Sequence, residues 1–312
     1  MTPCPACHAA ISKPAFRGPP RSFRRCRSCG TLFDTEPPTP EEVKALYEGK
    51  DYFVKDDAEG ADELWGYADD YLADRDFIEA KFDRVLAHVE KYVAPGRLLD
   101  VGAGPGFLVA AAKRRGWDAS GLDFNEWAAQ YARDELGLDV RVGDLAAGAF
   151  AGEQFDAVTL MDVVEHVSDP DDLVGRVAEI VKPGGVVALL TPDAGSRVSR
   201  LLGRRWPEVR RPGEHMVLFS VRGLSATLAR HGFAAAGWHS IGKTAPVATL
   251  LADVTPVAPR WSNKLRDVVG ERSIGKRVVE LDPRTKFVLY ARRVETPVAV
   301  PTAGPVRVSR KP

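Results

Sequence analysis

Apolar runs and helically spaced apolar positions alternate along much of the chain. Short runs rich in valine and leucine predict buried strands, and apolar residues at helical spacing predict helices between them. The expected strands are 97–101, 119–123, 139–142, 155–162, 186–192, 232–242 and 285–294, and the expected helices are 74–92, 105–116, 125–137, 171–185 and 220–232. This alternation is typical of a mostly parallel sheet covered on both faces. The sequence therefore predicts a doubly wound α/β fold with a seven-stranded sheet.

A proline-rich stretch marks a boundary between segments of the chain. The stretch TEPPTP at 35–40 cannot continue a regular element and predicts a boundary. We expect a small module over 1–35, a linker with N-terminal helices over 36–96 and a main domain over 97–294. Within the main domain, 195–216 is an insert after the fifth strand, and the apolar stretch 244–275 suits either a lid or a homodimer face. Residues 295–312 are predicted to be disordered.

Charge is balanced overall but unevenly distributed. The chain of 312 residues has 43 basic and 43 acidic side chains, yet residues 1–33 contain no acid and the segment 34–90 is strongly acidic. No apolar run is long enough to cross a membrane, and the N-terminus lacks the basic start and apolar stretch of a signal peptide. We therefore expect a cytoplasmic protein without a membrane span.

All four cysteines lie near the N-terminus in two CxxC pairs, Cys4 with Cys7 and Cys26 with Cys29. Two such turns can direct four thiolates at one point, which suits structural Zn²⁺ in a reducing compartment. The spacing predicts a zinc ribbon, with disulfides as the alternative. The surrounding arginines either balance the charge of the metal site or bind nucleic acid or a phosphorylated substrate.

Glycines and aspartates follow the ends of the first three predicted strands of the main domain. Asp100 is followed by the GxGxG turn 102–106, which differs from a dinucleotide fingerprint because Phe107 stands where a glycine is required. Asp123 ends the next strand and can accept two ribose hydroxyls, and Asp144 follows the third and can accept an adenine amine. Because the carboxyl ends of parallel strands face one crevice, these side chains predict a nucleoside-binding site.

These motifs resemble those of the class I S-adenosylmethionine-dependent methyltransferases. The segment LLDVGAGPGFLVAAAKRRGWDASGLDFN is similar to their first two motifs, FDAVTLMDVVEHVSDPDDLV to their fourth-strand motif and VKPGGVVALLTP to their fifth-strand motif. A subgroup with an N-terminal zinc ribbon is resembled by the two CxxC pairs together with the segments TEPPTPEEVKALYEGKDYF, RRWPEVRRPGEHMVLFS and VLYAR. The resemblance implies an enzyme that binds S-adenosylmethionine through Asp100, Gly102, Ala103, Gly104, Gly106, Asp123, Phe124, Asp144, Leu145 and Met161.

Methyl transfer to a hydroxyl requires a base, and two histidines are candidates. His166 follows the fourth strand, and His215 lies in the insert after the fifth. The DxxEH motif also resembles a cluster of the ubiquinone-pathway O-methyltransferases for which a divalent ion has been proposed. By that resemblance, a second metal would lie at Asp162, Glu165 and His166.

The insert 195–216 is rich in arginine and carries candidates for acceptor binding, Arg204, Arg205 and Trp206. Arginine binds phosphate or carboxylate, and an aromatic ring can stack on the acceptor. We expect methylation of an oxygen on an anionic small metabolite, sugar or glycolipid. Alternatives are C-methylation of a nucleotide-linked keto-sugar, or a zinc-ribbon nucleic-acid-binding protein or RNA methyltransferase. Nucleic acid is disfavoured as a partner because no NPPY-type run follows the fourth strand.

Overall fold

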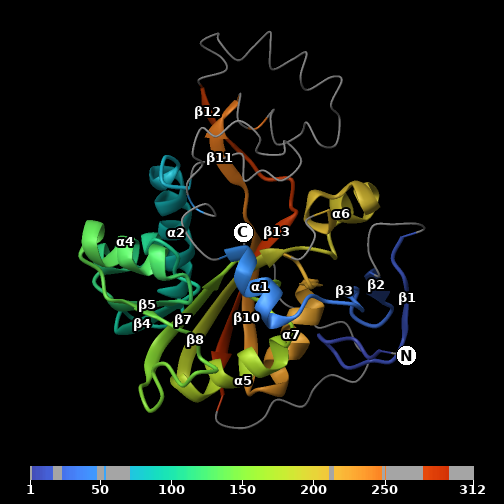
Figure 1. The fold of residues 1–312 in the computed structure, drawn as a ribbon, viewed down its shortest axis with the longest axis horizontal. Coiled ribbons are helices and arrows are strands. Elements are labelled where there is room, and N and C mark those ends of the chain that lie inside the picture. Colours follow the sequence, from blue (N-terminus) through green and yellow to red (C-terminus); the bar gives the residue numbers. More distant parts are fainter. Residues whose placement is uncertain are drawn as a thin grey trace.

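The computed structural model describes residues 2–16, 23–47, 53, 71–210, 214–247, 250 and 277–294. Its central sheet consists of β4 (Arg97–Val101), β5 (Asp118–Asp123), β6 (Val140–Val142), β7 (Phe155–Met161), β8 (Val181–Pro192), β10 (Phe233–Ser240) and β13 (Lys286–Arg293). The strand order is β10-β13-β8-β7-β4-β5-β6 (Figure 1). Strands β4 to β8 are parallel to one another, and β13 is antiparallel to both β8 and β10. The predicted doubly wound, seven-stranded α/β fold is confirmed.

Both faces of the sheet are covered, as the alternation of apolar strand residues requires. Leu98 and Leu99 are adjacent and fully buried, but they pack into different hydrophobic clusters. The cluster of Leu98 includes side chains of α2 (Arg75–Val89), α3 (Phe107–Arg114) and α4 (Glu126–Leu136). The cluster of Leu99 includes side chains of α5 (Pro170–Ile180) and α7 (Val221–Arg230).

The predicted helix 171–185 is too long. α5 ends at Ile180, and the segment KPGG belongs to the start of β8. Pro183 cannot donate a helical hydrogen bond, and Gly184 has a φ of +79°. A Cβ on Gly185 would lie 2.9 Å from the main-chain oxygen of Asp156. The close approach of β7 therefore favours an irregular strand at this point.

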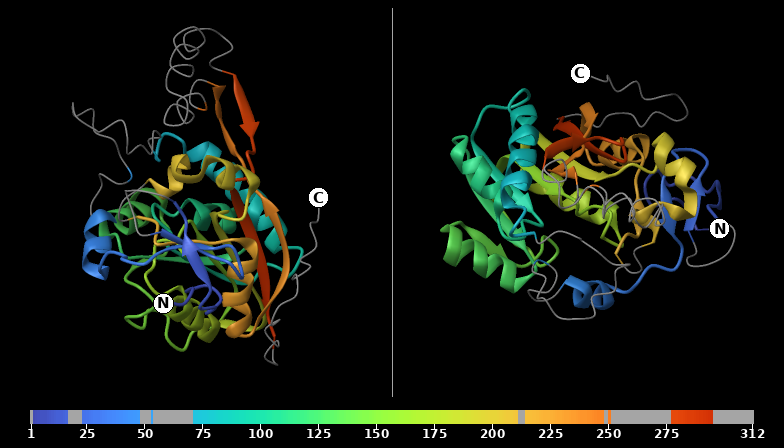
Figure 2. Two further views of the ribbon diagram at one scale, coloured as in Figure 1. Left: turned by 90° about the vertical axis from the view of Figure 1, so that its right-hand side faces the viewer. Right: turned by 90° about the horizontal axis from the view of Figure 1, so that it is seen from above.

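The cysteine module forms a second sheet that includes a strand of the main domain. Its strands are β1 (Ser12–Pro14), β2 (Phe23–Cys26), β3 (Leu32–Asp34) and β9 (Val217–Leu218), in that order. Leu32 pairs with Leu218, and Phe33 pairs with Val217. In Figures 1 and 2 the ribbon strands lie beside α6 (Arg197–Leu202). The ribbon is thus joined to the main domain through β9.

Helix α7 provides a second contact for the ribbon. Ser220 Oγ donates to the Cys29 main-chain oxygen at 2.7 Å, and Thr227 Oγ1 donates to the Ala6 oxygen at 2.9 Å. A Cβ on Gly223 would lie 2.1 Å from Thr31 Oγ1. Only glycine therefore permits this close approach between the helix and the ribbon.

The remaining described elements are α1 (Pro40–Tyr47) and a hairpin of β11 (Lys243–Pro246) and β12 (Val278–Leu281). Most of the stretch 244–275 and all of 295–312 lie outside the described residues. Among the helices of the described ranges, none is both long and apolar enough to span a membrane.

We predict that Gly223→Ala destabilises the protein, because the new methyl group would collide with Thr31 Oγ1. Overpacking of this kind costs about 1–3 kcal/mol, which denaturant unfolding would measure. The double variant Thr31→Ala/Gly223→Ala should recover part of the loss. Wild-type stability in the single variant would contradict this packing of the ribbon on α7.

Candidate active site

The glycine turn after β4 is shaped by close neighbours as well as by backbone conformation. Gly102 and Gly106 have φ values of +74° and +85°. A Cβ on Gly102 would lie 2.3 Å from Val163 Cγ2, and one on Gly106 would lie 2.8 Å from Leu138 Cδ1. The turn therefore brings bare backbone to the carboxyl end of β4, where a ligand can approach it closely.

The structure brings the predicted aspartates to adjacent strand ends. Asp123 Oδ2 accepts a hydrogen bond from the Gly104 N–H at 2.7 Å, and its Oδ1 accepts from the Asn125 N–H at 2.8 Å. The Gly143 N–H donates to the Asp123 main-chain oxygen, which places Asp144 beside this edge. A carboxylate has further lone pairs, so Asp123 can still accept from ribose hydroxyls. The hydrogen bonds from Gly104 and Asn125 fix the orientation of the Asp123 carboxylate toward the glycine turn.

The predicted adenine site combines apolar and polar side chains. Phe124 is 38% exposed, whereas Leu145 and Met161 are buried. Asp144 is exposed, and its Oδ1 accepts from the Ala147 N–H at 2.6 Å. An exposed ring, buried apolar side chains and an exposed carboxylate are the kinds of group that bind a nucleobase. The assignment of these residues to S-adenosylmethionine stays a prediction.

Two aromatic side chains, from residues that the sequence analysis did not select, lie against this edge. Phe53 Cε1 would be 3.2 Å from a Cβ on Gly104, and its ring stacks on Trp127. Tyr47 Oη lies 2.6 Å from His166 Nδ1. Both residues belong to the segment TEPPTPEEVKALYEGKDYF, which the sequence analysis matched as a whole without selecting single residues.

Glu165, His166 and His215 form a compact cluster beyond the end of β7. Their potential metal-binding atoms all lie within 4.8 Å of one another, and the two imidazole centroids are 4.7 Å apart. The N–H groups of Met216 and Val217 donate to the Glu165 main-chain oxygen at 2.8 and 3.3 Å. These bonds bring the insert, and with it His215, to the end of β7.

Burial disfavours charge in this cluster. Glu165 is fully buried; its Oε2 accepts from Thr191 Oγ1 at 2.9 Å, and its Oε1 has no hydrogen-bond partner in the described structure. Burial and then the nearby Asp162 charge raise the Glu165 pKa to about 8. Burial and then His215 lower the His166 pKa to about 3. Both groups are therefore mostly neutral near pH 7.

The structure corrects the predicted ligand set of the second metal. Asp162 Oδ1 accepts an ion-paired hydrogen bond from Lys286 Nζ at 2.8 Å. His215, and not Asp162, completes the cluster with Glu165 and His166. The sequence motif missed His215 as a partner because it lies far along the chain.

The prediction that Trp206 contacts the acceptor is also corrected. Its side chain is only 2% exposed and packs against Phe23, Leu32 and Leu218. It is therefore part of the contact between the ribbon and the insert. Arg204 and Arg205, in a short 3-10 helix, are exposed.

The four cysteines have geometry suited to zinc. Their sulfurs lie within 4.8 Å of one another, with Cys4 Sγ to Cys29 Sγ at 3.7 Å and Cys7 Sγ to Cys26 Sγ at 3.5 Å. A tetrahedral site with Zn–S bonds of about 2.3 Å places sulfurs about 3.8 Å apart. None of the four forms a disulfide. The donor set fits a structural zinc ion.

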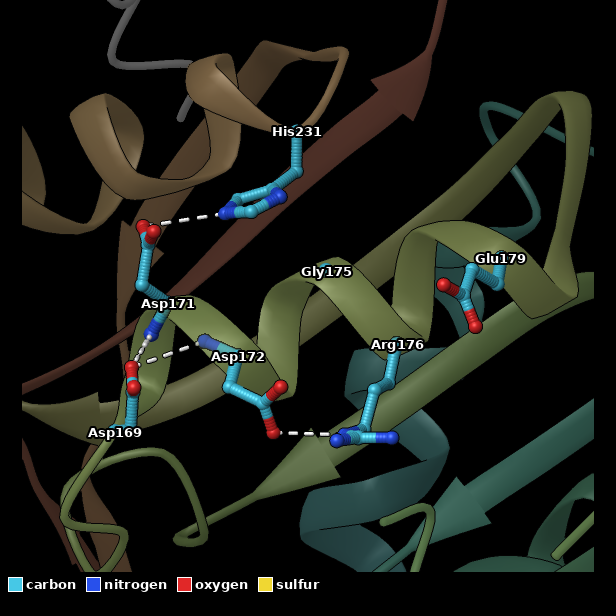
Figure 3. A pocket seen from close by; sticks show the side chains of 7 residues that line it. All are labelled: Asp169, Asp171, Asp172, Gly175, Arg176, Glu179 and His231. Atoms are coloured by element: carbon cyan, nitrogen blue, oxygen red, sulfur yellow. Dashed lines mark hydrogen bonds and ion pairs between the residues drawn. The ribbon is translucent and has the colours of Figure 1, made fainter. Parts of the chain in front are cut away.

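A pocket of about 390 Å³ lies along α5 and is lined by Asp169, Asp171, Asp172, Gly175, Arg176, Glu179 and His231 (Figure 3). Asp169 caps α5, and His231 Nε2 lies 3.1 Å from Asp171. Arg176 pairs with Asp172 at 2.7 Å. Most charged groups of this pocket are thus paired with one another. None of its lining residues belongs to the predicted site.

We predict a pH-dependent contribution of Asp100 to stability. Burial raises the Asp100 pKa to about 7. The hydrogen bond from Thr159 opposes this increase, and the Asp123 charge adds to it. An unfolded aspartate titrates near 3.8, so this group's contribution to the free energy of unfolding falls as pH rises from about 4 to 7, by up to about 4 kcal/mol.

Asp100→Asn keeps an acceptor for Thr159 Oγ1 and removes the titration. Its stability relative to the wild type should therefore increase over this range, as measured by urea unfolding of the ligand-free protein. The exposed Asp118→Asn is the control. Parallel pH profiles for wild type and Asp100→Asn would refute the assignment.

Several curated proteins with similar sequences share one description. The chain is 37% identical over 141 residues to a ubiquinone biosynthesis O-methyltransferase of Roseobacter denitrificans, covering 43% of this chain and 56% of that protein. It is 40% identical over 114 residues to the protein of the same description from Ruegeria pomeroyi. This match covers 35% of this chain and 46% of that protein. The chain spans about half the length of these relatives.

A solved structure described as a methyltransferase, from Bacillus halodurans C-125, has a TM-score of 0.50 and 20% identity, covering 67% of this chain and 98% of that one. This likeness supports the fold. The sequence profile of the methyltransferase domain family matches residues 71–236, which include α2 to α7 and strands β4 to β8. The chain therefore belongs to the methyltransferase domain family.

Proposed function

We propose that the protein transfers the methyl group of S-adenosylmethionine to an oxygen of a small acceptor molecule. The observation that carries this proposal is the position of Glu165, His166 and His215. The three side chains lie together beyond the end of β7, and Val163, which precedes Glu165 by two residues, packs directly on Gly102 of the glycine turn. The descriptions of the curated relatives also support O-methylation.

S-adenosylmethionine supplies a methyl group on a good leaving group, so the protein must mainly align the acceptor and remove its proton. His215 Nδ1 lies 2.8 Å from the Glu208 main-chain oxygen. Because a carbonyl oxygen only accepts, Nδ1 carries a proton and Nε2 carries the lone pair in the neutral ring. In this proposal His215 Nε2 accepts the acceptor's hydroxyl proton. The low pKa of His166 makes it a poor base near pH 7.

The same three residues support a second, metal-assisted route. One carboxylate with two imidazoles is a donor set that suits Zn²⁺ or Fe²⁺ better than Mg²⁺. The unpartnered Glu165 Oε1 favours this site, since a cation would compensate the burial of a carboxylate there. A divalent ion would supply Lewis-acid activation of the acceptor oxygen.

The acceptor class remains a proposal: an anionic small metabolite, sugar or glycolipid. If the methylated atom is a carbon, as in a nucleotide-linked keto-sugar, the same base would have to remove a proton from that carbon. A nucleic-acid role is less well supported because Arg25 of the ribbon already donates to the Gly30 and Ala194 main-chain oxygens, at 2.8 Å each.

Calorimetric titration of zinc-loaded protein with S-adenosylhomocysteine tests the cofactor site. We expect one site per chain in the wild type and at least tenfold weaker binding in Asp123→Ala, since hydrogen bonds to a charged group are lost. Asp118→Ala, at the opposite end of β5, is the matched control. If wild-type protein does not bind, the proposed function fails.

Metal analysis tests the two metal sites separately. After dialysis against zinc, we expect two ions per chain in the wild type, loss of the ribbon ion in Cys26→Ser and loss of the other ion in His215→Ala. If the wild type binds a single zinc ion and His215→Ala still binds it, the second metal site is ruled out. His215 would then act as a base alone.

A further inference from the structure

One residue of the insert, Glu208, faces the His215 ring with two of its oxygens. Glu208 lies in the short 3-10 helix Pro207–Val209, and His215 lies two residues before β9. The His215 Nδ1 is 2.8 Å from the Glu208 main-chain oxygen and 3.5 Å from the carboxylate Oε2 of the same residue. Two oxygens that can accept a hydrogen bond therefore lie next to one ring nitrogen.

These oxygens influence which nitrogen of His215 carries the proton. A carbonyl oxygen can only accept, and so can an ionised carboxylate. A proton on Nδ1 interacts favourably with both oxygens, whereas a lone pair on Nδ1 would face the lone pairs of both. The arrangement thus favours the tautomer that has Nδ1–H and leaves the lone pair on Nε2.

Burial strengthens the influence of the Glu208 carboxylate. The side chains of His215 and Glu208 are only 3% and 13% exposed, so water screens the interaction between them weakly. Within the described residues, the Glu208 carboxylate forms no other ion pair. Since 3.5 Å is long for a hydrogen bond, the carboxylate acts mainly through its charge on the Nδ1–H dipole.

The ribbon holds the turn that carries Glu208. The flanking residues Trp206 and Val209 are 2% and 4% exposed, and both belong to the hydrophobic cluster that contains Phe23 of the ribbon. A turn with a buried side chain on each side of Glu208 has little freedom to move. The packing of the insert on the ribbon therefore helps to fix the position of Glu208 relative to His215.

The same histidine takes part in the proposed chemical centre. The centroids of the His166 and His215 rings are 4.7 Å apart, and the Met216 N–H donates to the Glu165 main-chain oxygen at 2.8 Å. Glu208 is not a member of the cluster that Glu165 forms with the two histidines. A histidine that acts through one ring nitrogen is commonly oriented by an acceptor at the other. Glu208 is placed to supply that acceptor.

We propose that Glu208 is a positioning residue for His215. Its main-chain oxygen and its carboxylate together hold the Nδ1–H tautomer and the orientation of the ring, so that Nε2 can accept the acceptor's proton or bind a divalent ion. This inference rests on the proposed function. Glu208 itself contacts neither the acceptor nor the ion, because it acts through His215.

The test compares wild type, Glu208→Ala and Glu208→Gln, all with zinc in the ribbon. The control, Glu135→Gln, makes the same chemical change at an exposed position of α4. Nitrogen NMR of the imidazole rings at one alkaline pH measures the tautomer of His215, whose signals are identified by their loss in His215→Ala. Zinc titration measures the affinity of the second metal site, and calorimetry measures S-adenosylhomocysteine binding.

We expect the Nδ1–H tautomer in the wild type and the control, and a measurable share of the Nε2–H tautomer in Glu208→Ala. The zinc affinity of the second site should fall about 10- to 100-fold in Glu208→Ala, with unchanged S-adenosylhomocysteine binding. Glu208→Gln should recover part of both losses, because its amide oxygen still accepts but carries no charge.

An Nε2–H tautomer in the wild type, or an unchanged tautomer in Glu208→Ala, would overturn the inference. So would equal weakening of zinc and S-adenosylhomocysteine binding, since that would indicate a general loss of structure. If the wild type has no second zinc site, the tautomer alone decides. If the wild type does not bind S-adenosylhomocysteine, the proposed function fails, and the tautomer still tests the link between Glu208 and His215.

Discussion

The short strand β9 is the constraint on which the proposed chemical centre depends. Its residues Val217 and Leu218 pair with β3 of the ribbon, and the N–H groups of Met216 and Val217 donate to Glu165. His215 immediately precedes this segment. The cysteine module therefore contributes to the wall of the candidate active site, because its β3 holds the strand that positions the insert.

This arrangement would give a zinc ion held by the four cysteines a structural role beyond the ribbon itself. The module is small, with short strands and little core of its own, so a tetrathiolate ion would supply much of its folding energy. The ribbon also buries Trp206 and Leu218 in a shared cluster with Phe23. A loss of zinc would consequently loosen the insert as well as the N-terminus.

Electrostatics at the strand ends follow from burial. Asp100, Glu165 and His166 are all shifted toward their neutral forms, whereas Asp162 stays ionised beside Lys286. The candidate active site thus combines largely neutral groups at Asp100, Glu165 and His166 with an ion pair between Asp162 and Lys286.

The sequence by itself determined the strand and helix order, the glycine turn and the cysteine pairs. These features are local: periodicity sets the element type, backbone freedom requires glycine, and CxxC spacing brings two thiols together. It misjudged KPGG, because the contact of Gly185 with β7 decides that segment. Only the tertiary structure placed His215 beside Glu165, paired Asp162 with Lys286 and buried Trp206 against the ribbon, since each depends on residues distant in sequence that folding brings into contact.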